Sequence, residues 1–190
     1  MPAEDAGRWD QRYAEEERFR TFTQPRPFLV EHARLLPKRG LALDAAMGLG
    51  GNASLLLKRG LQVIGVDISG VAVCQVHERL PELLAVQADL TSFQLAPDSV
   101  NVILNFYYLQ RDLWTSYRRW LKPGGLLFIE TMTRQMSKLQ PDLDPAYLLE
   151  PAELSLAFSD WEILVYQEGW QKSRQGHPKA VASMIARRPV

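Results

Sequence analysis

Asp44, Asp67 and Asp89 each stand at the end of a short apolar segment. Asp44 leads into a glycine-rich turn at residues 46–51, and a helix pattern follows that turn. Carboxylates accept hydrogen bonds from hydroxyl and amino groups, and a glycine-rich turn before a helix lets backbone N–H groups approach a ligand closely. The two hydroxyls of a ribose would suit Asp67, and the exocyclic amine of an adenine would suit Asp89. The pattern therefore predicts a site for an adenosine-containing ligand.

The glycine turn also fits a second class of nucleotide site. Residues 48–53 match the dinucleotide fingerprint G-x-G-x-x-G/A, and Asp67 lies about where the ribose-binding acid of that fingerprint belongs. Asp44 would repel a pyrophosphate, however, and Asp89 has no role in a dinucleotide site. A chain of 190 residues is also short for the substrate domain that usually accompanies such a fold. An NAD(P)-dependent oxidoreductase is therefore the weaker alternative.

Alternating strand and helix patterns are expected to position these residues. Nearly continuous apolar strands between helices are typical of a parallel sheet covered on both faces. The last two strand-like segments have no helix pattern between them, which predicts a C-terminal antiparallel hairpin. The expected strands are 41–43, 61–66, 83–88, 100–104, 125–130, 161–167 and 181–186, and the expected helices are 8–22, 28–36, 52–59, 69–81, 112–120 and 151–158. The predicted fold class is α/β, a Rossmann-like, mostly parallel seven-stranded sheet, whose ligands bind at the carboxyl ends of the strands.

Composition argues against several kinds of partner. Lys and Arg together number 22, as do Asp and Glu, so no overall positive charge favours nucleic acid. The single Cys74 rules out an internal disulfide and a multi-cysteine metal site, and we interpret it as a small buried residue. No apolar stretch reaches membrane-spanning length, and the polar N-terminus is unlike a signal peptide. We expect a cytoplasmic protein, a monomer or weak homodimer, without metal, nucleic-acid or membrane partners.

The motifs together resemble one known family over about residues 40–131. In chain order they are Asp44-x-x-x-Gly48-x-Gly50, Asp67, Asp89 and Leu121-Lys-Pro-Gly-Gly125, and they resemble the class I S-adenosylmethionine-dependent methyltransferases. The opening Trp9-Asp-x-Arg-Tyr13 is similar to the small tellurite- and thiopurine-type methyltransferases. The resemblance implies an enzyme with S-adenosylmethionine as cofactor and S-adenosylhomocysteine as product. We expect one domain over residues 1–190, comprising a helical lid segment (1–38), a cofactor-binding core (40–131) and a C-terminal helix and hairpin (145–190).

The resemblance also implies which residues bind the cofactor. Asp44 would hold the glycine turn and the cofactor's amino group, and Asp67 would bind the ribose hydroxyls with Ile68 against the adenine. Asp89 and the Leu90 backbone would bind the adenine edge. The implied cofactor-binding residues are Asp44, Ala46, Gly48, Gly50, Gly51, Asp67, Ile68, Asp89, Leu90 and Asn105, the last through a carbonyl facing the methionine amino group.

Two positions depart from the family's pattern. Ala46 replaces a common glycine, and Met47 stands where a small residue or cysteine is often found. Both departures keep a non-catalytic S-adenosylmethionine-binding protein as an alternative to an enzyme.

The methyl acceptor is expected on the side of the fourth strand. The segment Asn105-Phe-Tyr-Tyr108 lacks the two prolines of the [D/N]-P-P-[F/Y] turn that DNA-base methyltransferases of this fold use, so nucleic acid is an unfavoured acceptor. A thiol, a metalloid oxyanion or a small metabolite remains. Because the methyl group is already activated, alignment can supply most of the acceleration, and no catalytic residue is assigned. Candidate acceptor or lid residues are Trp9, Tyr13, Tyr107, Tyr108, Arg111 and His177.

Overall fold

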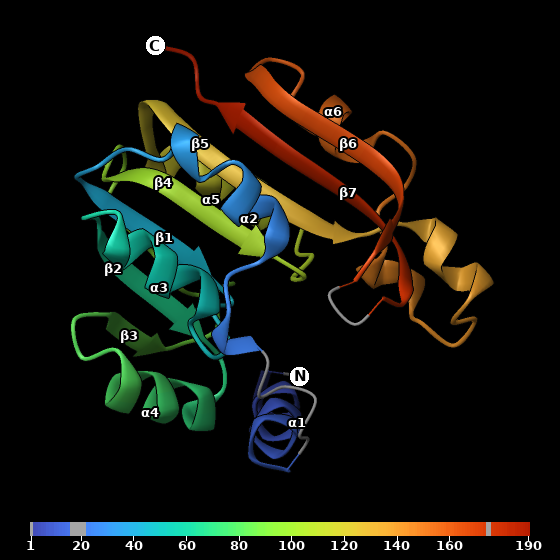
Figure 1. Cartoon of the computed structure of the whole chain (residues 1–190), viewed down its shortest axis with the longest axis horizontal. Coiled ribbons are helices and arrows are strands. Elements are labelled where there is room, and N and C mark those ends of the chain that lie inside the picture. Colours follow the sequence, from blue (N-terminus) through green and yellow to red (C-terminus); the bar gives the residue numbers. More distant parts are fainter. Residues whose placement is uncertain (1, 16–21, 174–175) are drawn as a thin grey trace.

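The computed structural model describes residues 2–15, 22–173 and 176–190, and it contains one seven-stranded sheet (Figure 1). The strand order is β3-β2-β1-β4-β5-β7-β6. Pairs among the first five strands of this order are parallel, whereas β7 is antiparallel to both β5 and β6. The strands are β1 (Leu41–Ala45), β2 (Gln62–Asp67), β3 (Leu84–Gln87), β4 (Val100–Phe106), β5 (Leu121–Met132), β6 (Glu162–Lys172) and β7 (Pro178–Arg187). The predicted mixed sheet with a C-terminal hairpin is confirmed.

Helices cover both faces of the sheet and bury two separate apolar clusters. One cluster includes side chains of α2, α3 and α4, and the other includes side chains of α5 and α6. The first helix lies beside α4, beyond the carboxyl ends of β1 and β2 (Figure 1). The helices are α1 (Pro2–Glu15), α2 (Pro27–Glu31), α3 (Gly51–Lys58), α4 (Gly70–Arg79), α5 (Leu113–Trp120) and α6 (Glu153–Ala157). No helix in the described part of the chain is long and apolar enough to cross a membrane.

Three details differ from the sequence-based expectations. Helix α1 begins at Pro2, six residues before the predicted start, and residues 16–21 of the predicted helix 8–22 lie outside the described residues. The predicted helix 28–36 is divided at His32 into α2 and a short 3₁₀ helix, Ala33–Leu35. Cys74 is exposed rather than buried, because the buried face of α4 is formed by Ala72 and Val76, and a residue two positions along a helix faces away.

Candidate active site

The sheet brings the ends of β1, β2 and β4 to one edge. In the register of the sheet, Ala45 lies between Val66 of β2 and Asn105 of β4, so the three strands end side by side. Asp44 and Asp67 are both buried there, with 1% and 5% of their surfaces exposed. Two nearly buried carboxyl groups at the ligand-binding edge of an α/β sheet indicate a functional site.

A strained turn follows β1. Ala46, Gly48 and Gly50 have φ values of +55°, +52° and +66°, the left-handed region that glycine adopts readily and alanine does not. This conformation explains why a glycine is common at the position of Ala46. The turn is held by Asp67, whose Oδ2 accepts from the Gly48 N–H at 2.8 Å and whose Oδ1 accepts from the Ser69 N–H at 3.0 Å. Asp67 therefore performs the turn-fixing role that the resemblance implies for Asp44.

Asp44 has one carboxylate oxygen without a hydrogen-bond donor among the described residues at this edge of the sheet. Its carboxyl group accepts from the backbone N–H of Ala53 in the first turn of α3, and burial raises its pKa to about 8. Its Oδ2 is buried and has no hydrogen-bond partner in the described part of the protein. Because buried polar atoms in native proteins are nearly always paired, this orphaned oxygen is suited to a ligand's donor.

Met47 does not crowd the ligand side. Its side chain is buried in the cluster shared by α2, α3 and α4, where it packs over the backbone of Gly65 in β2. The core therefore accommodates the Met47 side chain, which is larger than the residue often found at this position.

The Asn105 side chain points away from the ligand edge. Its Nδ2 donates to the Tyr117 hydroxyl of α5 at 2.7 Å, and both residues are fully buried. The Asn105 Oδ1 is buried without a hydrogen-bond partner in the described part of the protein, and the resemblance implies that the backbone carbonyl of Asn105 faces the cofactor.

The predicted adenine-binding residues follow β2 and β3. Ile68 and Asp89 are partly buried, and Asp89 Oδ1 accepts from the Thr91 N–H at 2.9 Å, which shapes the turn after β3. Leu90 is 4% exposed and packs in the core, so its backbone rather than its side chain is available.

Helix α1 is fastened over this edge. Asp10 Oδ1 accepts from the Ser69 hydroxyl at 2.6 Å and from the Val71 N–H at 3.0 Å, which places a carboxylate at the N-terminus of α4. Trp9 and Tyr13 stack with their ring centroids 5.6 Å apart. The Tyr13 hydroxyl comes so close to the glycine turn that a Cβ on Gly48 would lie 2.8 Å from it. The predicted lid residues thus lie against the predicted cofactor turn.

The two adjacent tyrosines after β4 face different surroundings. Tyr108 is partly buried, and its pKa is raised to about 12 by burial and by the nearby carboxylates of Asp89, Asp5 and Asp67. Tyr107 has φ +61° and lies instead beside Glu130 of β5. Burial and Glu130 raise the pKa of Tyr107. Tyr107 is therefore on the β5 side of the edge, and Tyr108 is on the side of the predicted cofactor-binding acids.

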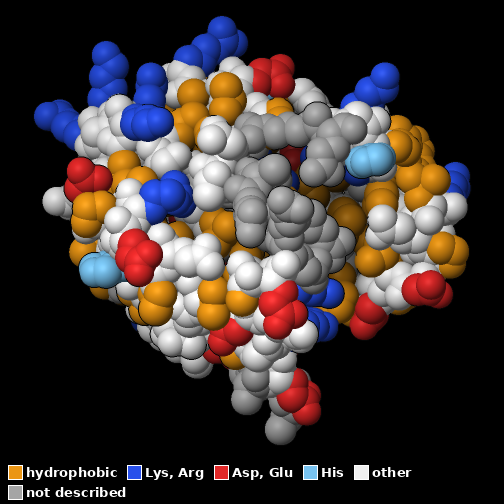
Figure 2. Space-filling view, turned by 60° about the horizontal axis from the view of Figure 1, so that its bottom comes forward, with side chains coloured by type: hydrophobic (Ala, Val, Ile, Leu, Met, Phe, Trp, Pro, Cys, Tyr) orange, Lys and Arg blue, Asp and Glu red, His pale blue; other side chains and the backbone are white. Residues whose placement is uncertain are grey.

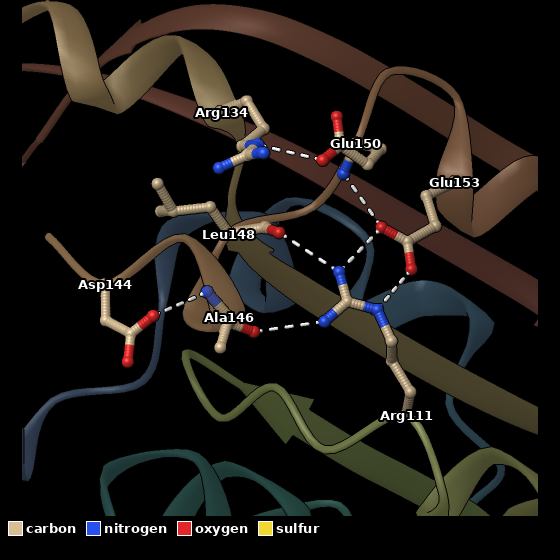
Figure 3. Close-up of polar contacts among 7 residues, drawn as sticks. All are labelled: Arg111, Arg134, Asp144, Ala146, Leu148, Glu150 and Glu153. Atoms are coloured by element: carbon tan, nitrogen blue, oxygen red, sulfur yellow. Dashed lines mark hydrogen bonds and ion pairs between the residues drawn. The ribbon is translucent and has the colours of Figure 1, made fainter.

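Arg111 has partners within the chain (Figure 3). Its Nε and Nη2 donate to the two carboxylate oxygens of Glu153 at 2.5 and 2.9 Å. Nη1 and Nη2 also donate to the carbonyls of Ala146 and Leu148 at 3.0 and 3.1 Å. These contacts tie the loop after β4 to α6, so we do not include Arg111 in the acceptor site. His177 is exposed in the β6–β7 loop, where its N–H donates to the Ser173 hydroxyl.

Sequence reasoning missed five polar residues around the edge. They are Asp10, Arg26, Glu130, Lys179 and Ser183. Glu130 had a usable signal, since it is an acid directly after the apolar run 126–129. Arg26 and Lys179 had no signal, because only the folded chain brings them together. In the described part of the chain, no group of His, Cys, Asp and Glu residues has the geometry of a metal site.

Comparisons with known proteins agree with this geometry. Residues 42–125 match the family described as a methyltransferase domain. A probable S-adenosylmethionine-dependent methyltransferase of Mycobacterium tuberculosis is 34% identical over an alignment of 113 positions, which covers 55% of this chain and 41% of that protein. The chain thus spans about two-fifths of the length of that curated relative.

Solved structures show the same fold at low identity. A methyltransferase from Methanosarcina mazei is 17% identical with a TM-score of 0.72, covering 88% of this chain and 99% of that one. TehB from Haemophilus influenzae is 18% identical with a TM-score of 0.71, covering 95% of this chain and 67% of that one.

Residues 42–125 are therefore similar to the class of S-adenosylmethionine-dependent methyltransferases. S-adenosylmethionine is the cofactor of this class. The resemblance noted in the sequence is confirmed, and the dinucleotide alternative finds no support.

Proposed function

We propose that this protein transfers a methyl group from S-adenosylmethionine to a small-molecule acceptor. The observation that carries the proposal is the buried, unpartnered Oδ2 of Asp44 beside a left-handed glycine turn that Asp67 holds in place. A thiol, a metalloid oxyanion and another small metabolite are all acceptors of this kind.

The residues at the edge fit the cofactor. The free oxygen of Asp44 suits the amino group of its methionine part. Each oxygen of Asp67 accepts one backbone N–H, and a carboxylate oxygen has room for a second donor, so the ribose hydroxyls can bind there. Asp89 at the end of β3 suits the amine of adenine. The narrow turn at Gly48 leaves its backbone available to the methionine part.

Bound S-adenosylmethionine supplies a methyl group on a positively charged sulfur. The chain aligns the acceptor with that group, and alignment can be worth roughly 7–11 kcal/mol. Helix α1, fastened through Asp10, excludes water from the edge.

We further propose that this protein acts as a monomer or weak homodimer and that its acceptor is not a nucleic acid. On the face in Figure 2, most basic side chains lie along the upper rim and most acidic ones lie in the lower half. This face therefore has no continuous positive field of the kind that attracts a polyanion.

Asp67→Ala tests the assignment of the ribose-binding acid. We expect its affinity for S-adenosylhomocysteine to fall by about 1–3 kcal/mol, because two hydroxyl bonds and the anchor of the glycine turn are lost. Calorimetric titration measures the affinity. The exposed Asp142→Ala is the matched control and should bind like the wild type. An unchanged affinity in a folded Asp67→Ala variant would remove Asp67 from the site.

A further inference from the structure

A buried polar network occupies the acceptor side of the edge. Glu130 of β5 is 1% exposed, and its Oε1 accepts from the Tyr107 hydroxyl at 2.8 Å. Its Oε2 accepts from the Ser183 hydroxyl of β7 at 2.7 Å. Two hydroxyl donors therefore already satisfy the Glu130 carboxylate. The network joins Tyr107 to the middle of β7 through Glu130.

Lys179 joins this network with donors to spare. Its Nζ lies 3.4 Å from Glu130 Oε1, longer than the 2.7–2.9 Å of a strong charge-assisted hydrogen bond. The ammonium donates instead to the Tyr107 hydroxyl. It lies 4.9 Å from the centroid of the Tyr107 ring, at the hydroxyl end. The Lys179 side chain is 17% exposed, so an N–H donor remains for a ligand.

Arg26 approaches the same tyrosine from the segment before α2. Its guanidinium lies 4.5 Å from the centroid of the Tyr107 ring and 4.5 Å from that of Phe22. Its backbone N–H donates to Asn52 Oδ1 at 2.9 Å, which fixes this part of the chain to α3. Within the described ranges, no carboxylate oxygen lies within ion-pair distance of the Arg26 guanidinium. Aromatic rings hold the side chain while its donors stay unused.

The cluster of Arg26, Tyr107, Glu130 and Lys179 therefore holds two cations and one carboxylate. Burial lowers the pKa of Lys179, the nearby Glu130 carboxylate opposes that effect, and Arg26 lowers the pKa further. Glu130 can offset only one of these two cations, and partly buried charge without a counter-ion is costly. An anion that reaches both cations removes this cost. Arginine and lysine are the usual ligands of carboxylate and phosphate groups.

We propose that Lys179 and Arg26 bind an oxyanion of the methyl acceptor, so that the acceptor is a small carboxylate or phosphate compound. This inference rests on the proposed function for the identity of the site as an acceptor site. The binding of the oxyanion itself depends only on the cluster, which is present without a cofactor. Glu130 and Ser183 act as positioning residues for Lys179 and Tyr107.

The test is calorimetric titration with benzoate, phenyl phosphate and the neutral benzamide, with and without saturating S-adenosylhomocysteine. We expect one of the two anions to bind at least about tenfold more tightly than benzamide, the effect of one hydrogen bond to a charged group. Whichever anion binds more tightly identifies the carboxylate or the phosphate source. S-adenosylhomocysteine carries a carboxylate of its own. If the anion still binds when S-adenosylhomocysteine is saturating, the two cations are not occupied by that carboxylate.

Variants assign the effect to the two cations. Lys179→Met should weaken anion binding about tenfold or more, whereas Lys179→Arg should retain most of it. Lys172→Met, which removes an exposed charge at the end of β6, should have no effect. The second cation is tested in the same way: Arg26→Met should weaken anion binding, and Arg34→Met, at an exposed position, is its control. This pair of variants tests the proposal even if Lys179→Met does not fold.

Equal binding of the anions and benzamide would overturn the inference, as would folded Lys179→Met and Arg26→Met variants that bind like the wild type. If the wild-type protein binds the anion but does not bind S-adenosylhomocysteine, the result contradicts the proposed function and leaves the anion site in place.

Discussion

Asp44 is the residue whose ionisation connects the site to solution conditions. Burial raises its pKa to about 8, so the carboxyl group is mostly protonated at pH 7. A cofactor's ammonium group beside Oδ2 would favour the ionised form. We therefore expect binding of S-adenosylhomocysteine at pH 7 to release up to about one proton.

The proton release is measured by titrating in two buffers of different ionisation enthalpy. The apparent binding enthalpy should differ between the buffers for the wild type and agree for Asp44→Asn. Identical enthalpies for the wild type would contradict the role of Asp44. Without ligand, the raised pKa means that the native state binds more protons than the unfolded chain. The free energy of unfolding should therefore fall from about pH 4 to pH 8, and less steeply in Asp44→Asn.

At the residue scale, the sequence indicates which acids lie at the site but not which of them fixes the glycine turn. Asp44 and Asp67 were identifiable because each ends an apolar strand. Which of them fixes the glycine turn depends on the side-chain direction at the end of β2, which no local pattern specifies. Arg26 and Lys179 are more than 150 residues apart in the chain, so their convergence on Tyr107 follows only from the strand order.

At the scale of elements, the docking of α1 places the predicted lid residue Tyr13 against the glycine turn. Asp10 supplies two of its bonds to α4, at the Ser69 hydroxyl and the Val71 N–H. Asp10→Ala should weaken this docking by about 0.5–2 kcal/mol, the range measured for helix caps. Amide hydrogen exchange should become faster in α1 and stay unchanged in α5, and affinity for S-adenosylhomocysteine should fall. Unchanged protection of α1 would show that other contacts hold it. Glu31→Ala, at an exposed position in α2, is the control.

The loop after β4 and helix α6 are joined by the Arg111–Glu153 pair (Figure 3). Arg111→Met should lower the free energy of unfolding by about 1–2 kcal/mol at pH 7, because the pair and two carbonyl bonds are lost. Arg111 lowers the pKa of Glu153 below its usual 4.5. The pair's contribution is therefore complete above about pH 4.5 and is lost as the pH falls further.

Urea denaturation at about pH 7 and pH 3.5 checks this prediction. The difference between wild type and Arg111→Met should shrink at the lower pH. Arg134→Met removes an exposed pair with Glu150 and should cost less. A difference that stays constant with pH would refute the link to Glu153.

Element types were predictable because strand and helix patterns are local. Element ends were less so, as at His32, where one predicted helix is divided in two. The burial of Cys74 was predicted incorrectly, because hydrophobic character alone did not identify which face of α4 meets the sheet.

At the scale of the whole molecule, the strand order separates two halves of one site. The ends of β1, β2 and β3 carry the acids suited to an adenosine. The ends of β4 and β5 and the start of β7 carry Tyr107, Glu130 and Lys179, and Arg26 joins them from the segment before α2. A parallel sheet places both at the same edge, so a cofactor and an acceptor can meet between them.

The most direct measurement is a calorimetric titration of the purified protein with S-adenosylmethionine, S-adenosylhomocysteine and NAD in parallel. We predict that the first two bind with micromolar affinity, about −8 kcal/mol, and that NAD does not bind. Binding of NAD alone would contradict the account and make the turn at Gly48 a dinucleotide-binding turn.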